Sequence, residues 1–201
     1  LDRVDLEINK GEFVSVMGPS GSGKTTLLDM LGALARPSSG KISIGKEEIT
    51  KIPESQLYRI RREKIGFIFQ TYYLISTLTA LENVLVSTLP VRSNHQIREK
   101  AKKILETVDL ADRMSHRPNE LSGGQQQRVA IARSLIFEPD IILADEPTGN
   151  LDSRSGKEII NLMKRLSLER DKTFIIVTHD PEIVKETNRT FYLEDGRLKE
   201  K

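Results

Sequence analysis

The feature that most constrains the fold is an eight-residue glycine-rich run, Gly18-Pro19-Ser20-Gly21-Ser22-Gly23-Lys24-Thr25. The run matches G-x-x-x-x-G-K-[ST] at every fixed position, which is the pattern of a phosphate-binding loop. An apolar segment at Phe13–Met17 precedes it and predicts a buried strand, while residues 25–34 carry leucines at helical spacing. A glycine-rich turn that matched by chance would not need a strand before it and a helix after it, so we favour the phosphate-binding interpretation.

The residue types of this run suit a nucleotide with Mg²⁺. Glycines let successive backbone N–H groups point inward at phosphate oxygens, and the following helix directs the positive end of its dipole at the same anion. Lys24 supplies a mobile positive charge for the β- and γ-phosphates, and the Thr25 hydroxyl is a ligand for Mg²⁺. We therefore expect ATP with Mg²⁺ to be bound by Gly18, Pro19, Ser20, Gly21, Ser22, Gly23, Lys24, Thr25 and Thr26.

A second strand, residues 141–144, ends in two carboxylates, Asp145 and Glu146. Ligands bind at the carboxyl ends of parallel strands, so both side chains are expected beside the phosphate-binding loop. We expect Asp145 to hold Mg²⁺, directly or through water. Glu146 is the candidate general base that polarises a water for in-line attack on the γ-phosphate. Without the loop, two acids after an apolar strand would equally suggest an ordinary strand-ending turn.

The segment Leu121-Ser122-Gly123-Gly124-Gln125 precedes a helical pattern at residues 126–136. Ser122 and Gln125 have capping-box spacing, so a well-capped helix start would explain these two residues. It would not require the paired glycines, which suit close approach of a phosphate to N–H groups at a helix N-terminus. The segment lies about 100 residues after the first loop. One nucleotide seldom needs two phosphate-binding motifs from one chain. We therefore expect the glycine-rich loop and the paired glycines to bind different nucleotides.

Composition fits an ordinary globular protein of one domain. The 201 residues are 37% hydrophobic and 30% charged, and no apolar run approaches the roughly 20 residues that cross a bilayer. Any work at a membrane would therefore require a partner. The net charge of +2 does not indicate nucleic-acid binding, and the absence of cysteine excludes disulfides and thiolate metal sites. The best candidate for a nucleic-acid patch is the basic cluster Arg59, Arg61, Arg62 and Lys64. Glu54 and Glu63 lie in the same segment, so we interpret the cluster as a solvated helix face.

Periodicity along the chain predicts an α/β fold. Alternating apolar residues predict a strand at residues 4–8, and because a domain seldom begins inside a strand we expect further sequence before it. Short strands are expected at 41–44, 65–69 and 174–178, helices at 54–62 and 156–168, and a hairpin around Asp195-Gly196. Residues 71–137 are helical in pattern, with capping-box spacing between Thr79 and Glu82. We predict a mostly parallel sheet covered on both faces, a core of residues 1–70 and 138–201, and a helical subdomain of residues 71–137.

Together these motifs resemble the nucleotide-binding domain of ABC ATPases, over essentially the whole chain. The resemblance implies a P-loop NTPase fold with a mostly parallel sheet, an antiparallel β subdomain and an inserted α-helical subdomain. It implies ATP hydrolysis by two copies packed head-to-tail, in which Ser122, Gly123, Gly124 and Gln125 of one copy cover the γ-phosphate held by the other. It also implies a transmembrane permease as partner, and hence a place at the cytoplasmic face of the membrane.

Three further functional residues follow from the resemblance alone. Gln70 resembles the Q-loop glutamine, which contacts Mg²⁺ or the water, so the expected metal ligands are Thr25, Gln70 and Asp145. Gly149-Asn150-Leu151-Asp152 resembles the D-loop, which crosses the dimer interface. His179 resembles the switch histidine that contacts the γ-phosphate, whereas a lone histidine at a strand end would otherwise be assigned a structural role.

Some features match no family position. His95 and His116 are expected to be surface residues. The family's adenine-stacking aromatic lies upstream of the first strand, and no residue before Phe13 is aromatic, so either it lies in preceding sequence or the base is held differently. Residues 71–74 are Thr-Tyr-Tyr-Leu, in a region (71–81) that in the family receives the permease. These rings either seal the subdomain junction or contact the partner, and both interpretations stay open.

Within the family, the amino-acid sequence resembles that of the lipoprotein-release and macrolide-export group, the LolD and MacB type, at residues 65–70, 78–84 and 145–152. The alternative is a soluble ABC ATPase that acts on nucleic acid or ribosomes. Such proteins contain long coiled coils or tandem ABC domains, whereas residues 24–121 hold no long heptad run and the motifs of one ABC domain are found here. A P-loop kinase outside the family would leave residues 121–125 unexplained.

Overall fold

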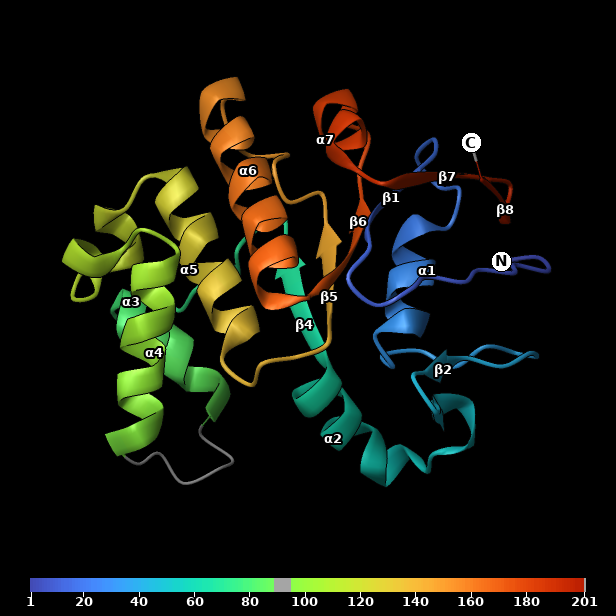
Figure 1. Ribbon diagram of the computed structural model, residues 1–201, viewed down its shortest axis with the longest axis horizontal. Coiled ribbons are helices and arrows are strands. Elements are labelled where there is room, and N and C mark those ends of the chain that lie inside the picture. Colours follow the sequence, from blue (N-terminus) through green and yellow to red (C-terminus); the bar gives the residue numbers. More distant parts are fainter. Residues whose placement is uncertain (89–94, 201) are drawn as a thin grey trace.

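The computed structural model describes residues 1–88 and 95–200 and contains one six-stranded sheet with helices on both faces (Figure 1). The strand order is β4-β5-β6-β1-β7-β8, and only β8 runs antiparallel to its neighbour. This confirms the mostly parallel sheet. The strands are β1 (Phe13–Met17), β4 (Ile65–Phe69), β5 (Ile141–Asp145), β6 (Thr173–Val177), β7 (Arg189–Glu194) and β8 (Arg197–Glu200).

The register of the sheet places the predicted site residues at one edge. Phe69 at the end of β4 lies opposite Asp145 at the end of β5, and Asp145 lies opposite Val177 at the end of β6. Val16 of β1 also pairs with Val177. Because these strands are parallel, the residues that follow them emerge together at the carboxyl edge of the sheet, which is where ligands bind in such folds.

Alternate residues of the central strands enter two separate hydrophobic clusters. Phe13 and Ile176 belong to the cluster packed by α3–α7, whereas Val14 and Val177 belong to the cluster packed by α1 and α2. The sheet is therefore buried on both faces, which explains its continuous apolar strands. The helices are α1 (Lys24–Leu31), α2 (Glu54–Lys64), α3 (Ala80–Leu85), α4 (His95–Thr107), α5 (Gly123–Leu135), α6 (Ser153–Arg170) and α7 (Pro181–Glu186).

The helix starts follow the sequence signals closely. The capping boxes predicted at Thr79 and Ser122 are both present, each with a side-chain bond to the third helical residue and one in return. Helix α7 was not predicted, although Asp180 before a proline is a helix-start signal and does cap this helix. Figure 1 shows α3, α4 and α5 together beside the β4 edge of the sheet. The proposed division into a core and the subdomain 71–137 stays a prediction, because one hydrophobic cluster runs through both parts.

The structure differs from the predicted elements at three places near the N-terminus. No strand is assigned within the described residues 1–10, although Val4, Leu6 and Ile8 are half-buried and the residues between them are exposed. The alternation therefore reports burial against the α1-side cluster rather than a strand ladder. The strand at 41–44 is reduced to β2 (Ser43–Ile44), paired antiparallel with β3 (Glu47–Glu48). Helix α1 ends at Leu31 and not at residue 34.

The basic cluster on α2 is less solvated than predicted. Arg59 is exposed, but Arg61, Arg62 and Lys64 are half-buried. Arg61 donates to the Ala33 carbonyl at 2.8 Å, and the other two pair with carboxylates. Among the described residues, no helix is both long enough and apolar enough to cross a membrane.

Candidate functional site

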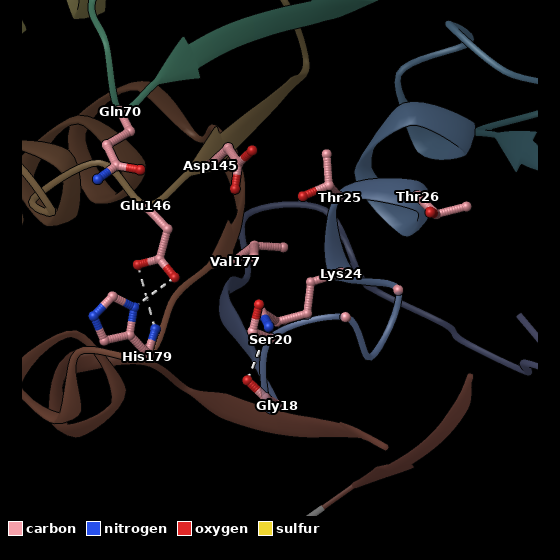
Figure 2. Close-up of a pocket in the computed structure, with 12 residues that line it drawn as sticks. Gly18, Ser20, Lys24, Thr25, Thr26, Gln70, Asp145, Glu146, Val177 and His179 are labelled. Carbon is pink, nitrogen blue, oxygen red and sulfur yellow. Dashed lines mark hydrogen bonds and ion pairs between the residues drawn. The ribbon is translucent and has the colours of Figure 1, made fainter. Parts of the chain in front are cut away.

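The carboxyl edge of the sheet opens into a cavity of about 590 Å³. Figure 2 shows the phosphate-binding loop on one side of it and residues from the ends of β4, β5 and β6 on the other. The structure thus brings together most of the predicted site residues in one cavity. Its lining residues are Gly18, Ser20, Gly21, Gly23, Lys24, Thr25, Thr26, Gln70, Asp145, Glu146, Val177 and His179.

The phosphate-binding loop packs tightly on the sheet. A Cβ on Gly18 would stand 2.1 Å from the Leu193 carbonyl oxygen of β7, so only glycine fits there. Gly23 has a φ of +104° and provides the left-handed residue from which α1 starts. The Lys24 Nζ donates to the carbonyl oxygens of Gly18 and Pro19, at 2.8 Å each. The helix N-terminus and the lysine therefore direct positive potential into one cavity.

Three side chains with oxygen atoms that can coordinate a metal ion line the cavity. Thr25 comes from the first turn of α1, Asp145 ends β5, and Gln70 follows β4. Burial raises the pKa of Asp145, and the nearby carboxylates of Glu146 and Asp29 raise it further. Hydroxyl, carboxylate and carboxamide oxygens are the donors that Mg²⁺ prefers, usually together with substrate phosphates. A divalent cation would also offset the crowded negative charge, so these residues fit Mg²⁺.

The Glu146 carboxylate is oriented by the end of β6. Its Oε1 lies 2.7 Å from His179 Nδ1, and its Oε2 accepts from the Thr178 hydroxyl at 3.2 Å and the His179 N–H at 3.3 Å. The Glu146 backbone is left-handed, with a φ of +45°, which costs about 1–3 kcal/mol and persists only where the surroundings hold it. The side chain of Glu146 is 16% exposed and that of His179 is 76% exposed. A carboxylate held in this way can accept a proton from water in the cavity.

Gln70 is tied to the segment that follows Glu146. Its Nε2 donates to Asn150 Oδ1 at 3.2 Å, and Asn150 Nδ2 donates to the Gln70 carbonyl at 2.9 Å. A Cβ on Gly149 would stand 2.7 Å from Gln70 Nε2, so the glycine allows this close approach. The predicted Q-loop and D-loop segments are therefore joined within one chain, a link that the sequence did not indicate.

Residues 122–125 lie away from this cavity. Among the described residues that line it, none belongs to this segment. Ser122 is exposed, and the backbone of Gly123 faces Tyr72 and Leu151. The proposed role of this segment at a second nucleotide therefore stays a prediction.

Two residues of the site were missed by the sequence reasoning. Thr178 bonds Glu146, and its position directly after β6 is a signal that could have identified it. Gln127 is fully buried and donates to the Pro147 carbonyl at 2.6 Å, which fixes α5 to the residue after Glu146. Of the two unassigned histidines, His95 is exposed as expected, whereas His116 is half-buried and lies 3.0 Å from Arg113 Nη1.

Comparison with known proteins gives matches over nearly the whole chain. A family model described as "ABC transporter" matches residues 1–149. An uncharacterized ABC transporter ATP-binding protein of Thermotoga maritima is 49% identical over 98% of this chain and 85% of the relative. The lipoprotein-releasing system ATP-binding protein LolD 1 of Chlorobium chlorochromatii is 47% identical over 98% of this chain and 81% of that protein. The macrolide export ATP-binding/permease protein MacB 1/2 of Paracoccus denitrificans is 49% identical, but only 30% of its length is covered.

Solved structures give the same result. The dimeric post-hydrolysis structure of the ATP-binding cassette MJ0796 bound to ADP and Pi matches with a TM-score of 0.87 and 46% identity, over 98% of this chain and 88% of that one. The corresponding protein comes from Methanocaldococcus jannaschii. The structure of cbiO1 from Clostridium perfringens, part of the transporter complex cbiONQ, matches with a TM-score of 0.88 and 30% identity, over 96% and 78% of the two chains.

Proposed function

This chain belongs to the ABC transporter family, and we propose that it drives a separate permease of the lipoprotein-release or macrolide-export type. It is an ABC transporter ATP-binding subunit, an ATPase that uses ATP and Mg²⁺. Relatives named for lipoprotein release and for macrolide export align with 98% of the chain at 47% and 49% identity, which supports the proposed type. The alternative, a soluble ABC ATPase of nucleic acid or ribosomes, is not favoured by these relatives.

We propose roles for the residues of the cavity as follows. The loop from Gly18 to Thr26 binds the phosphates, with Lys24 as its mobile charge. Thr25, Asp145 and Gln70 would hold Mg²⁺, which when bound neutralises charge on the β- and γ-phosphate oxygens. Glu146 accepts a proton from the attacking water, and His179, which lies 2.7 Å from the Glu146 carboxylate, would contact the γ-phosphate. The observation that carries this proposal is the convergence of these side chains from four elements on one cavity.

The second half of the site would come from another copy of the chain. Two solved structures of the related cassette MJ0796 are dimeric, which supports a dimer here. We propose that Ser122, Gly123, Gly124 and Gln125 of one copy cover the γ-phosphate bound by the other. The support is geometric, because these residues form the N-terminus of α5 outside their own chain's cavity, with Ser122 exposed and Gly123, Gly124 and Gln125 half-buried. Hydrolysis would remove the phosphate that joins the two surfaces, and the dimer would loosen.

A second hollow is the proposed docking site for the permease. This groove has a volume of about 620 Å³ and lies between α2, β4 and the C-terminal part of α5. Tyr58 and Tyr73 at the groove are 59% and 66% exposed, although most large apolar side chains of the protein are buried. An apolar groove with exposed rings and arginines fits a short amphipathic helix of a membrane protein. We propose that the chain is held at the cytoplasmic face of the membrane by this contact.

Copurification tests the permease and its groove together. Tagged wild-type chain should retain a polytopic membrane protein when it is purified from membranes in mild detergent, and Tyr58→Asp should lose it. Tyr192→Asp is the matched control, because Tyr192 is 37% exposed on β7 and lies outside the groove. Copurified RNA or DNA in place of a membrane protein would support the alternative function. Retention of the permease by Tyr58→Asp would show that docking occurs elsewhere.

A further inference from the structure

The loop that follows Gln70 has an uncommon backbone that one arginine holds in place. Tyr72 and Tyr73 both adopt left-handed φ angles, of +53° and +49°. Consecutive non-glycine residues in this region persist only where contacts determine them, and they cluster at functional sites. Arg133 provides such contacts, because its Nη2 donates to the Tyr72 carbonyl at 2.6 Å and its Nη1 donates to the Tyr73 carbonyl at 2.5 Å.

These two bonds need an arginine at this position. A planar guanidinium can donate to two neighbouring carbonyls at once, whereas an ammonium is a point charge on a flexible stem. Arg133 is half-buried, and burial lowers its pKa from the ordinary value. The group nevertheless stays charged at neutral pH, since arginine is not deprotonated in proteins. The two bonds are therefore charge-assisted and stronger than neutral ones.

Helix α5 touches the same loop a second time, at its other end. Arg133 lies in the last turn of α5, whereas Gly123 is its first residue. The Tyr72 hydroxyl lies 3.2 Å from the position that a Cβ on Gly123 would occupy. One helix thus contacts the Tyr72 backbone with its C-terminal part and the Tyr72 side chain with its N-terminus.

The turn is also close in sequence to Gln70. Gln70 precedes Tyr72 by two residues, and two hydrogen bonds join Gln70 to Asn150. The ring of Tyr73 packs edge-on against Phe69, with centroids 5.2 Å apart. A shift of the turn would therefore move Phe69, Gln70 or both, and Gln70 lines the nucleotide cavity.

We propose that Arg133 is a positioning residue for ATP hydrolysis, because its guanidinium fixes the turn at Tyr72 and Tyr73 that sets the place of the Gln70 carboxamide on the same side of the cavity as Glu146 (Figure 2). The proposal rests on the proposed role of Gln70 in the site. Residues 122–125 form the N-cap and first turn of α5. The same helix therefore connects the nucleotide cavity of its own chain with the segment proposed to contact the nucleotide of a second copy.

The first test separates positioning from binding. ATP hydrolysis and ATP affinity are measured for the wild type, Arg133→Ala and Arg133→Lys, with circular dichroism to verify folding. We expect kcat of Arg133→Ala to fall about 10- to 100-fold, as for small misplacements of catalytic groups, while the ATP dissociation constant changes less than about twofold. Arg133→Lys should be intermediate and serves as the test if Arg133→Ala does not fold. Wild-type kcat in both variants, or an equal loss of affinity and kcat, would overturn the proposal.

The matched control removes an arginine that makes the same kind of contact elsewhere. Arg165 on α6 donates to the Thr107 carbonyl at 2.9 Å and lies outside the cavity. Arg165→Ala should keep the wild-type kcat. A similar loss in this variant would mean that the effect of Arg133→Ala is a general loss of stability.

A spectroscopic test observes the turn itself. The chain contains no tryptophan, so Tyr73→Trp introduces a single reporter in the turn. Its fluorescence anisotropy should fall when Arg133→Ala is added and should not change when Arg165→Ala is added. An unchanged anisotropy would show that Arg133 does not hold the turn.

Gln70→Ala distinguishes failure of this proposal from failure of its premise. If Gln70→Ala hydrolyses ATP as fast as the wild type, the proposed role of Gln70 is wrong and the positioning role falls with it. If Gln70→Ala is slow while Arg133→Ala is fast, only the role of Arg133 is wrong.

Discussion

Replacing Glu146 by glutamine tests the proposed chemistry with little disturbance of the structure. The carboxylate makes one close contact through Oε1, at 2.7 Å from His179 Nδ1, and accepts two bonds of 3.2 and 3.3 Å through Oε2. A carboxamide oxygen can keep the two bonds at Oε2, and its NH₂ group can donate to His179 Nδ1 in the tautomer that carries the proton on Nε2. The side chain should therefore remain in place, and the principal loss is basicity.

The size of the effect follows from that loss. A positioned general base contributes about 10²- to 10⁴-fold to the rate. Because a tenfold change in rate corresponds to about 1.36 kcal/mol, Glu146→Gln should raise the barrier to hydrolysis by about 2.7–5.4 kcal/mol. The phosphate-binding loop is unchanged, so the dissociation constant for ATP should stay within about twofold of the wild type.

Phosphate release in a single turnover and sizing chromatography with ATP together measure both expectations. Hydrolysis should slow by the stated factor, and the variant should elute as a dimer because ATP persists between the two copies. Glu138→Gln is the control, since Glu138 is an exposed carboxylate paired with Lys100 outside the cavity. A loss of less than about tenfold would reject Glu146 as the base. A variant that stays monomeric under saturating ATP would reject the shared nucleotide.

Three further predictions concern other parts of the chain. Ser122→Arg should leave ATP binding by the isolated chain intact but abolish hydrolysis, since it blocks the opposite site; equal loss of both would contradict a shared site. In EDTA, Asp145→Asn should raise the melting temperature at pH 7, because burial raises the pKa of Asp145 and the wild type loses stability as the pH rises through that pKa. This gain should vanish below the ordinary value of 3.8, where the wild-type carboxyl is protonated; a variant less stable than the wild type at pH 7 would refute it. Asn83→Leu should lower the free energy of unfolding by about 2–4 kcal/mol in urea titrations. The reason is that fully buried Asn83 accepts from the Ile75 N–H at 2.7 Å and shares its NH₂ group among the carbonyls of Ile75, Leu78 and Thr79. A loss below about 1 kcal/mol would refute that account.

The assembly of the cavity could be predicted because it depends on strand ends. Asp145 ends an apolar strand, while Gln70 and the residues after Val177 follow one, and parallel strands bring their carboxyl ends to one edge. The capped starts of α3 and α5 were equally visible, since the capping box is a local pattern. These features depend on contacts near in sequence or on one general rule of sheet topology.

Features that depend on unusual backbone conformations were not predictable. Helix α1 ends in a Schellman motif, in which the Leu34 N–H bonds the Asp29 carbonyl and the Ala33 N–H bonds the Met30 carbonyl. The left-handed residue of this motif is Ala33, with a φ of +54°, where sequence rules expect glycine or asparagine. The left-handed conformations of Tyr72 and Tyr73 could not be predicted either. They are stabilised by Arg133, which is about 60 residues away in the sequence.

The aromatic segment after Gln70 shows why two interpretations stayed open. Tyr72 is half-buried beside Gly123, as expected of a ring that seals the junction between α5 and the sheet. Tyr73 is 66% exposed beside the groove, as expected of a ring available to a partner. Sequence spacing could not separate the two, because both residues lie in a turn where neither helical nor strand periodicity applies.

The contact between Gly18 and the Leu193 carbonyl has a consequence for the C-terminal hairpin. The floor under the phosphate-binding loop is a backbone atom of β7, so mutation of a side chain cannot relieve a clash at position 18. Even alanine there would have to push two main chains apart. Conversely, deletion or a shift of register within β7 and β8 should displace the phosphate-binding loop and weaken ATP binding. This holds although neither strand contributes a residue to the described lining of the cavity. Shortened versions of the chain should therefore keep this hairpin if they are to bind nucleotide.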